Sequence, residues 1–376
     1  MSSAGYNGKM HVLIATPLYP PEAGGPATYS RALEQGLPGR GIEVSMLPFA
    51  RVRHLPKLVR HVRYLLYLVI HGRNADLLLA LDPVSVGLPV AVASFLLRKP
   101  YVVKVVGDYA WEQGRQRHGI RMSLDEFITT AHIPFPTQVL RAVESFVARR
   151  AQHLIVPSEY LKKVVQTWGV NRDRVTVIYN AVPHATPSSK VPSFAPASGE
   201  KIVTVGRLVP WKGVPGLIDS LARVRNEVPD ATLVIVGDGP ERLALETYAR
   251  ARLPESAVIF TGMRSHADTL AIMRDADIFV LNSSYEGLSH VLIEAMSLAR
   301  PIVATRAGGN TELITDGEDG LLANVGDSNE LGEKILELLK NPEKAGSLGE
   351  RARKRSEDFS EERMIEDTTA FLKTCI

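Results

Sequence analysis

Twelve short apolar runs, separated by longer amphipathic stretches, constrain the fold of this chain more than any other feature. Several runs are nearly continuous Val, Ile and Leu, which is typical of parallel strands covered on both faces. Strands that alternate with helical patterns indicate βαβ units, so we predict an α/β protein with doubly wound parallel sheets. The runs are 11–17, 44–49, 77–81, 101–106, 153–158 and 175–180, then 201–206, 232–237, 258–262, 278–283, 301–305 and 320–324.

A segment rich in Pro, Ser and Thr divides the runs into two sets of six. Residues 182–199 contain four prolines and five Ser or Thr, which is a linker composition. The chain has 376 residues, enough for two domains. We therefore predict two Rossmann-like domains that face each other across a cleft. The expected parts are a flexible N-terminus (1–9), an N-terminal domain (10–182), a linker (183–199), a C-terminal domain (200–355) and a C-terminal helix (356–376) that packs back on the N-terminal domain.

The charge of the chain is divided unevenly between its halves. Residues 1–190 contain 23 Lys or Arg and 12 Asp or Glu, a net charge of +11, and the remaining residues contain 21 and 29, a net charge of −8. This asymmetry indicates an anionic partner or surface for the first half. The basic residues lack interleaved aromatic side chains, so a nucleic-acid partner is not expected.

The sequence gives no sign of secretion or of a disulfide framework. The first residues have no apolar core of a signal peptide, and the single cysteine, Cys375, cannot form an internal disulfide. We therefore expect a cytoplasmic protein. The window 77–97 is long enough to cross a bilayer and has only Asp82 charged, but Pro83, Gly87 and Pro89 interrupt it. We interpret it as a strand and a buried helix.

Two glutamates lie close to a predicted helix start after the run 278–283. Glu286 lies on the loop, and Glu294 lies about one and a half turns into a helix that we expect to begin at Ser289. The N–H groups at such a helix start form an anion site. A carboxylate accepts hydrogen bonds well from the vicinal hydroxyls of a sugar. The segment therefore predicts a sugar and a phosphate bound side by side.

Two further loops that follow predicted strands carry phosphate-binding chemistry. Arg207 and Lys212 follow the run 201–206, and a forked guanidinium with an ammonium suits a pyrophosphate. Gly24 and Gly25 follow the first run, where glycines let the backbone approach a phosphate closely. Ligands of doubly wound sheets bind beyond the carboxyl ends of the strands, so we expect all of these loops to line the cleft.

Taken together, these motifs resemble those of glycosyltransferase family 4, the retaining nucleotide-sugar transferases with the GT-B fold. The resemblance rests on the E-x7-E spacing of Glu286 and Glu294, the G-R-L-x3-K-G stretch at 206–213, the Gly-Gly loop, and the sequence GGNTE at 308–312. Each motif alone is weak, but the ordered set is specific and covers nearly the whole chain. It implies two doubly wound domains, a nucleotide-sugar donor and a glycan or lipid-linked acceptor.

The resemblance also implies roles for the charged residues that match its motifs. Arg207 and Lys212 would hold the donor pyrophosphate and stabilise the leaving group. Glu286 would contact the donor sugar, and Glu294 would bind the ribose. The basic pair can replace a metal ion, so neither a metal nor another cofactor is expected.

Other matched residues would contact the donor mainly through their backbone. Gly24 and Gly25 would close over the phosphate, and the loop at Gly262 and Arg264 would lie beside the nucleobase. The backbone of Gly287, Leu288 and Ser289 would bind sugar hydroxyls or phosphate.

Asp108 follows the run 101–106, where the family often has a His or a His-Asp pair near the donor sugar. Two interpretations of Asp108 stay open: a catalytic group, or a helix cap. The stretch after it contains Arg115 and Arg117. We predict that these arginines bind the acceptor, because they follow the cleft end of a strand.

The basic segment 56–71 has apolar residues at helical spacing and admits two interpretations. One is a covered domain helix with a solvated basic end. The other is contact with an anionic membrane surface or a lipid-linked pyrophosphate acceptor, which would make the protein peripheral on the inner face of the plasma membrane. Two alternative functions also stay open: a nucleotide-sugar 2-epimerase of the GT-B fold, and a non-catalytic sugar-nucleotide-binding protein.

Overall fold

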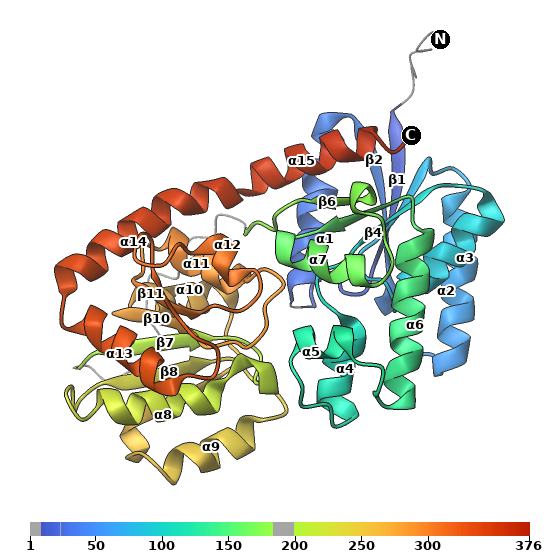
Figure 1. The fold of residues 1–376 in the computed structure, drawn as a ribbon. Helices are drawn as coiled ribbons and strands as arrows, with labels where there is room; N and C mark the ends of the chain where they lie inside the picture. The colour runs from blue at the N-terminus through green and yellow to red at the C-terminus, as the bar shows by residue number, and fades with distance from the viewer. Residues whose placement is uncertain (1–8, 23, 183–198) are drawn as a thin grey trace. The chain divides into compact units, whose positions relative to one another are not determined.

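The computed structural model describes residues 9–22, 24–182 and 199–376, so most of the predicted flexible N-terminus and linker lies outside the described residues. The described chain forms two compact units (Figure 1). Unit 1 contains the residues up to Ala181 together with Glu361–Ile376, and unit 2 is Val182–Ser360. The chain therefore returns to its first unit at the C-terminus.

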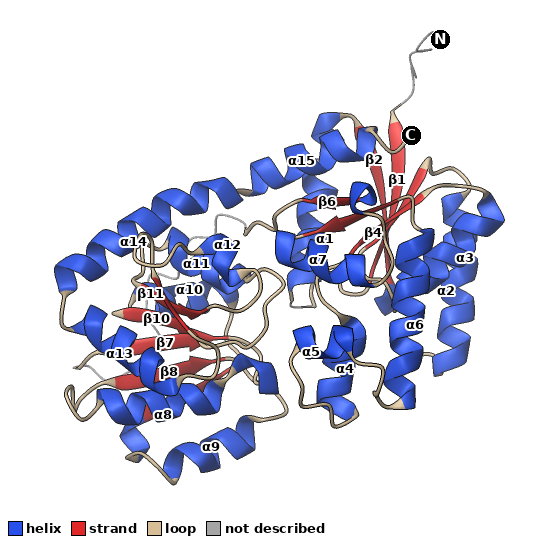
Figure 2. Ribbon diagram, in the orientation of Figure 1, coloured by secondary structure: helices blue, strands red, loops and turns tan. Residues whose placement is uncertain are grey.

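All twelve predicted strands are present, six in each unit. Both sheets are entirely parallel, as expected for apolar runs covered on both faces (Figure 2). Unit 1 contains β1 (Met10–Thr16), β2 (Ile42–Pro48), β3 (Leu77–Ala80), β4 (Tyr101–Lys104), β5 (His153–Val156) and β6 (Val175–Val177). Unit 2 contains β7 (Lys201–Val205), β8 (Thr232–Val236), β9 (Val258–Gly262), β10 (Ile278–Leu281), β11 (Ile302–Thr305) and β12 (Leu321–Ala323).

Helices connect the strands and cover both faces of each sheet. Those of unit 1 are α1 (Gly25–Gly36), α2 (Lys57–Gly72), α3 (Gly87–Leu97), α4 (Tyr109–Arg117), α5 (Leu124–Thr129), α6 (Phe135–Arg150), α7 (Glu159–Thr167) and α15 (Glu361–Lys373). Those of unit 2 are α8 (Val214–Val224), α9 (Arg242–Arg250), α10 (His266–Arg274), α11 (His290–Ser297), α12 (Asn310–Leu313), α13 (Ser328–Leu339) and α14 (Pro342–Ser356).

The sheet of unit 1 has the strand order β2-β1-β3-β4-β5-β6. Alternate residues point to opposite faces, so Val12 and Ile14 join a core with α1 and α15, while Leu13 and Leu78 lie against Gly72 at the end of α2. The C-terminal helix α15 completes the first core through buried Met364, Ile365, Phe371 and Leu372. A side chain at Gly36 of α1 would come within 2.8 Å of Ile365, so the two helices pack closely.

The sheet of unit 2 has the order β12-β11-β10-β7-β8-β9. Its core contains Ile202, Ile235 and Val280 from the strands, packed against α8 and α13. From β7 the chain proceeds outward to β8 and β9, then returns to place β10 on the other side of β7. The carboxyl ends of β7 and β10 therefore form the switch point of the sheet, where ligands of such folds bind.

Residues 77–97 fold as predicted into a strand, β3, and a helix, α3. No helix in the described part of the chain is long and apolar enough to cross a membrane. The basic segment also forms a helix, α2, for which the sequence left two interpretations open, and only one side of this helix is covered. Tyr64 and Leu68 are buried, whereas Val62 and Leu66 are more than half exposed.

Candidate active site

The loop after β7 is held in shape by neighbouring backbone. Leu208 exchanges hydrogen bonds with the β8–α9 loop, and a short 3₁₀ turn, Pro210–Lys212, ends at Gly213. Gly213 has φ +63°, and a Cβ there would lie 2.0 Å from the carbonyl oxygen of Asn282. Only glycine fits this left-handed position against the loop after β10.

Several hydrogen bonds join the loops that follow β7 and β10. The side chain of Asn282 donates to the carbonyl of Gly213 at 2.7 Å, and the N–H of Ser284 donates to the carbonyl of Trp211 at 2.7 Å. The loop that carries Arg207 and Lys212 is thus fixed to the loop that carries Glu286, at the switch point of the sheet.

Lys212 and Glu286 form an ion pair at this junction. The Lys212 Nζ lies 2.6 Å from Glu286 Oε1, which also accepts a hydrogen bond from Ser283 at 2.5 Å. The Glu286 side chain is only 11% exposed, whereas Arg207 is exposed. Arg207 and Lys212 line one small pocket with Gly206. The structure therefore brings three of the predicted charged residues together, with one guanidinium open to solvent.

The start of α11 lies directly after this pair. Gly287, Leu288 and Ser289 are buried, and the N–H of Gly309 donates to the carbonyl of Glu286 at 2.9 Å. Ser289 occupies the predicted N-cap position, but its side chain makes no capping hydrogen bond, and its buried hydroxyl has no partner among the described residues. The helix start thus places the Ser289 hydroxyl beside the N–H groups of the first helical turn.

Glu294, one turn further along α11, has a different partner. Its carboxylate lies 2.8 Å from Nε2 of His266, and this hydrogen bond raises the pKa of His266. His266 begins α10, directly after the loop that contains Gly262 and Arg264. Gly262 has φ +71°, and Arg264 is exposed. Glu294 therefore lies beside the loop predicted to meet the nucleobase.

The predicted residues of unit 1 also lie at carboxyl ends of strands. Gly24 follows β1, has φ +139° and precedes Gly25, the first residue of α1. Asp108 follows β4 and caps α4, accepting the N–H of Trp111 at 2.8 Å. The cap that the sequence left as one interpretation is thus present. A catalytic role for Asp108 stays a prediction. The residue is only 1% exposed, so its carboxyl does not lie open to solvent.

Asp108 faces a second buried acid, Glu144 of α6. Burial is the largest cause that raises the pKa of each carboxyl, and the charge of Asp108 raises the pKa of Glu144 further. A buried carboxyl beside a second acid ionises less readily, so burial and the neighbouring charge both favour the protonated form of Glu144. On α4, Arg115 donates to the carbonyl of Arg121, and Arg117 is exposed.

Comparison with known proteins places the chain in a family. Residues 187–355 match the family described as glycosyl transferases group 1, and residues 7–181 match the glycosyl transferase 4-like domain. The chain belongs to the family 4-type glycosyltransferases. An uncharacterized glycosyltransferase of Methanocaldococcus jannaschii is 31% identical over 220 residues, which are 58% of this chain and 59% of that protein. The glycogen synthase of Mycobacterium tuberculosis is 32% identical over 224 residues, which are 58% and 53% of the two chains.

Solved structures confirm the GT-B fold. HepE of Anabaena, in complex with UDP-glucose, has a TM-score of 0.77 at 22% identity and covers 97% of this chain and 100% of its own. The sucrose-phosphate synthase of Thermosynechococcus elongatus has a TM-score of 0.79 at 20% identity, with coverage of 97% and 98%. The match to the first two curated relatives spans little more than half of their length.

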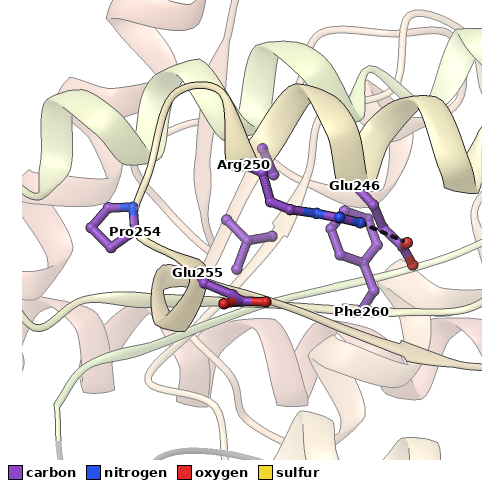
Figure 3. Close-up of a pocket in the computed structure, with 7 residues that line it drawn as sticks. Glu246, Arg250, Pro254, Glu255 and Phe260 are labelled. Atoms are coloured by element: carbon purple, nitrogen blue, oxygen red, sulfur yellow. Dashed lines mark hydrogen bonds and ion pairs between the residues drawn. The ribbon is translucent and has the colours of Figure 1, made fainter.

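Unit 2 of this glycosyltransferase contains two further pockets. One pocket is lined by Glu246, Arg250 and Phe260 near the amino end of β9, the edge opposite the switch point (Figure 3). A larger pocket, of about 430 Å³, is lined by Glu294, Leu270 and residues at the end of α14. The larger pocket shares Glu294 with the predicted donor site, whereas Arg207 and Lys212 line the small pocket described above.

Some residues of this site escaped the sequence-based prediction. His266 was not predicted, because its partner Glu294 lies 28 residues away in sequence. Ser283 was not predicted either, although it lies only three residues before its partner Glu286. Glu144 carried a usable signal, since it falls on the buried stripe of α6 with Thr137 and Val147. An acid on an apolar stripe indicates a buried partner.

Proposed function

We propose that this glycosyltransferase moves a hexose from a UDP or GDP sugar to a glycan or lipid-linked acceptor, with retention of configuration. One observation supports this proposal most strongly. Lys212, Glu286 and the start of α11 lie next to one another at the switch point of unit 2, and Arg207 beside them is exposed to solvent. HepE, which shares the fold, has been crystallised with UDP and with UDP-glucose, which favours a uridine donor.

The proposed mechanism follows from the charges that develop. When the bond between the sugar and the phosphate breaks, positive charge builds on the sugar and negative charge on the nucleoside diphosphate. Arg207, Lys212 and the helix start would stabilise the diphosphate. The acceptor hydroxyl would attack from the face that the diphosphate leaves, and a phosphate oxygen would accept its proton. Turnover then needs neither a separate base nor a metal ion.

The first test is nucleotide binding. We expect UDP or GDP to raise the melting temperature, because a ligand that binds only the folded protein stabilises it. Arg207→Ala should weaken binding by about tenfold to a hundredfold, since it removes hydrogen bonds to a charged phosphate. Arg223→Ala, which removes another exposed arginine of unit 2, is the control. Equal binding by both variants would contradict the proposed diphosphate site.

The second test is turnover. Donor and acceptor together should give a product whose anomeric configuration, read by NMR, matches that of the donor, and EDTA should leave the rate unchanged. Replacing Arg115 and Arg117 together by Ala should raise the KM for the acceptor without changing donor binding. An epimerised sugar nucleotide formed from donor alone would instead identify a 2-epimerase, and binding without any turnover would identify a non-catalytic module.

The acceptor side of the proposal includes the membrane. We propose that the protein is cytoplasmic and peripheral on the inner face of the plasma membrane, with the basic first half toward anionic lipid. The net charge of +11 over residues 1–190 supports this orientation.

A further inference from the structure

Three neighbouring helices of unit 1 present apolar rather than polar stripes to solvent. On α2, Val59, Val62, Leu66 and Ile70 recur at helical spacing and are each 51–61% exposed. A surface helix normally buries its apolar stripe and exposes a polar one. In α2 the buried side is also apolar, with Tyr64 and Leu68 fully covered, so the outer stripe is additional to what the core requires.

The next two helices repeat this pattern. On α3, Phe95 is 78% exposed and Leu96 is 58% exposed. On α6, Phe135, Val139 and Phe146 are exposed at intervals of four and seven residues, which places them on one side of the helix. The helix α3 contacts both α2 and α6, and the three helices form one layer on one side of the sheet (Figure 1). Their exposed stripes therefore belong to one surface of unit 1. We call this surface the α2–α3–α6 face.

The charge of the α2–α3–α6 face has one sign. Neither α2 nor α3 contains an Asp or Glu, and the only acid of α6 is Glu144, which is fully buried. The exposed arginines on these helices, or directly after them, are Arg63, Arg73, Arg98, Arg149 and Arg150. Most soluble proteins do not expose a large apolar patch without a partner. Here the partner must accept apolar side chains and carry negative charge around them.

We propose that the α2–α3–α6 face docks on the surface of an anionic lipid bilayer, with Phe95 and Leu96 inserted among the acyl chains and the arginines at the headgroups. A bilayer interface offers both complements at once, an apolar interior and a negatively charged rim. This inference assigns the docking face for the peripheral association proposed above, and it requires no membrane-spanning helix.

The experiment is flotation of the full-length protein with vesicles of phosphatidylcholine, with and without phosphatidylglycerol. The wild-type protein should float with the anionic vesicles and lose this binding as salt is added. Phe95→Asn with Leu96→Gln should reduce vesicle binding by about tenfold or more, because it removes the apolar insertion. Leu243→Gln, which alters an equally exposed leucine of unit 2 (75%), is the matched control and should bind as the wild type does.

Three outcomes would overturn the inference. They are equal recovery with neutral and anionic vesicles at low salt, unchanged binding by the Phe95/Leu96 variant, and a concentration-dependent dimer in solution that this variant abolishes. The dimer would show that a second copy of the chain covers the face. The melting shift with UDP or GDP, measured on the same preparations, shows that each variant is folded. It also tests the donor proposal separately, because the substituted residues lie outside the donor loops.

Discussion

At the residue scale, Lys104 is the side chain whose environment conflicts most with its chemistry. It lies at the end of β4, 1% exposed, with its ammonium 3.9 Å from the ring of Tyr29 and no hydrogen-bond partner among the described residues. Burial lowers the pKa of Lys104 to about 7. The core therefore favours the neutral amine, and charging it in place opposes folding.

We expect Lys104→Met to stabilise the protein, most strongly near neutral pH. Between pH ~7 and the unfolded value of ~10.4, the unfolded chain binds more protons at this position than the folded one. The wild-type free energy of unfolding should therefore rise by up to about 1.4 kcal/mol per pH unit relative to the variant. Urea unfolding at about pH 7 and about pH 9 measures the difference. Lys163→Met, at an exposed lysine, is the control. A pH-independent difference would show that Lys104 is charged in the fold.

Also at the residue scale, the position of Asp108 explains why the sequence left two interpretations of its role open. A residue that follows a strand at the predicted binding edge has the position of a catalytic group and of a helix cap alike. The structure shows the cap to Trp111, and it adds Glu144, whose pKa is raised by burial and by the charge of Asp108.

At the scale of elements, the proposed donor site depends on how closely two loops approach. The loop after β7 meets the loop after β10 at Gly213, where any side chain would collide with the backbone of Asn282. The sequence motif G-R-L-x3-K-G ends in this glycine because of that contact.

We expect Gly213→Ala to destabilise unit 2 well beyond the effect of a left-handed backbone alone. Gly317 supplies the comparison, since it has φ +80° but a Cβ added there would meet nothing within 4 Å. Gly317→Ala should lower the free energy of unfolding by about 1–2 kcal/mol. Gly213→Ala should lower it by about 1–3 kcal/mol more, because the clash is added. It should also weaken UDP binding, whereas Gly317→Ala should not. Equal effects of the two variants would contradict the close approach.

At the scale of the whole molecule, the two units are not two consecutive segments of the chain, because the last helix belongs to the first unit. The helix α14 belongs to unit 2, whereas α15 fills the core of unit 1 from the other end of the chain. The stability of unit 1 therefore depends on residues that are synthesised after all of unit 2.

We expect substitutions in these two helices to act on different units. Ile365→Ala, in α15, should lower the stability of unit 1 by about 2–4 kcal/mol, and Leu348→Ala, in α14, should lower that of unit 2 by a similar amount. In calorimetry, the nucleotide should raise the melting temperature of the transition that Leu348→Ala lowers, which is that of unit 2. It should not change the melting temperature of the transition that Ile365→Ala lowers, which is that of unit 1. A nucleotide effect on the second transition alone would place the donor site outside unit 2.

The sequence alone determined the twelve strands, their division into two parallel sheets and the family, because apolar runs and glycine motifs are local signals. It also marked Arg207, Lys212 and Glu286, whose types fit the chemistry of a diphosphate and a sugar. Tertiary structure decided which of these groups touch. The pairs of Lys212 with Glu286, His266 with Glu294 and Asp108 with Glu144 each join distant segments. It also decided that the outer stripe of α2 faces solvent, since helical spacing shows that an apolar side exists but not what covers it.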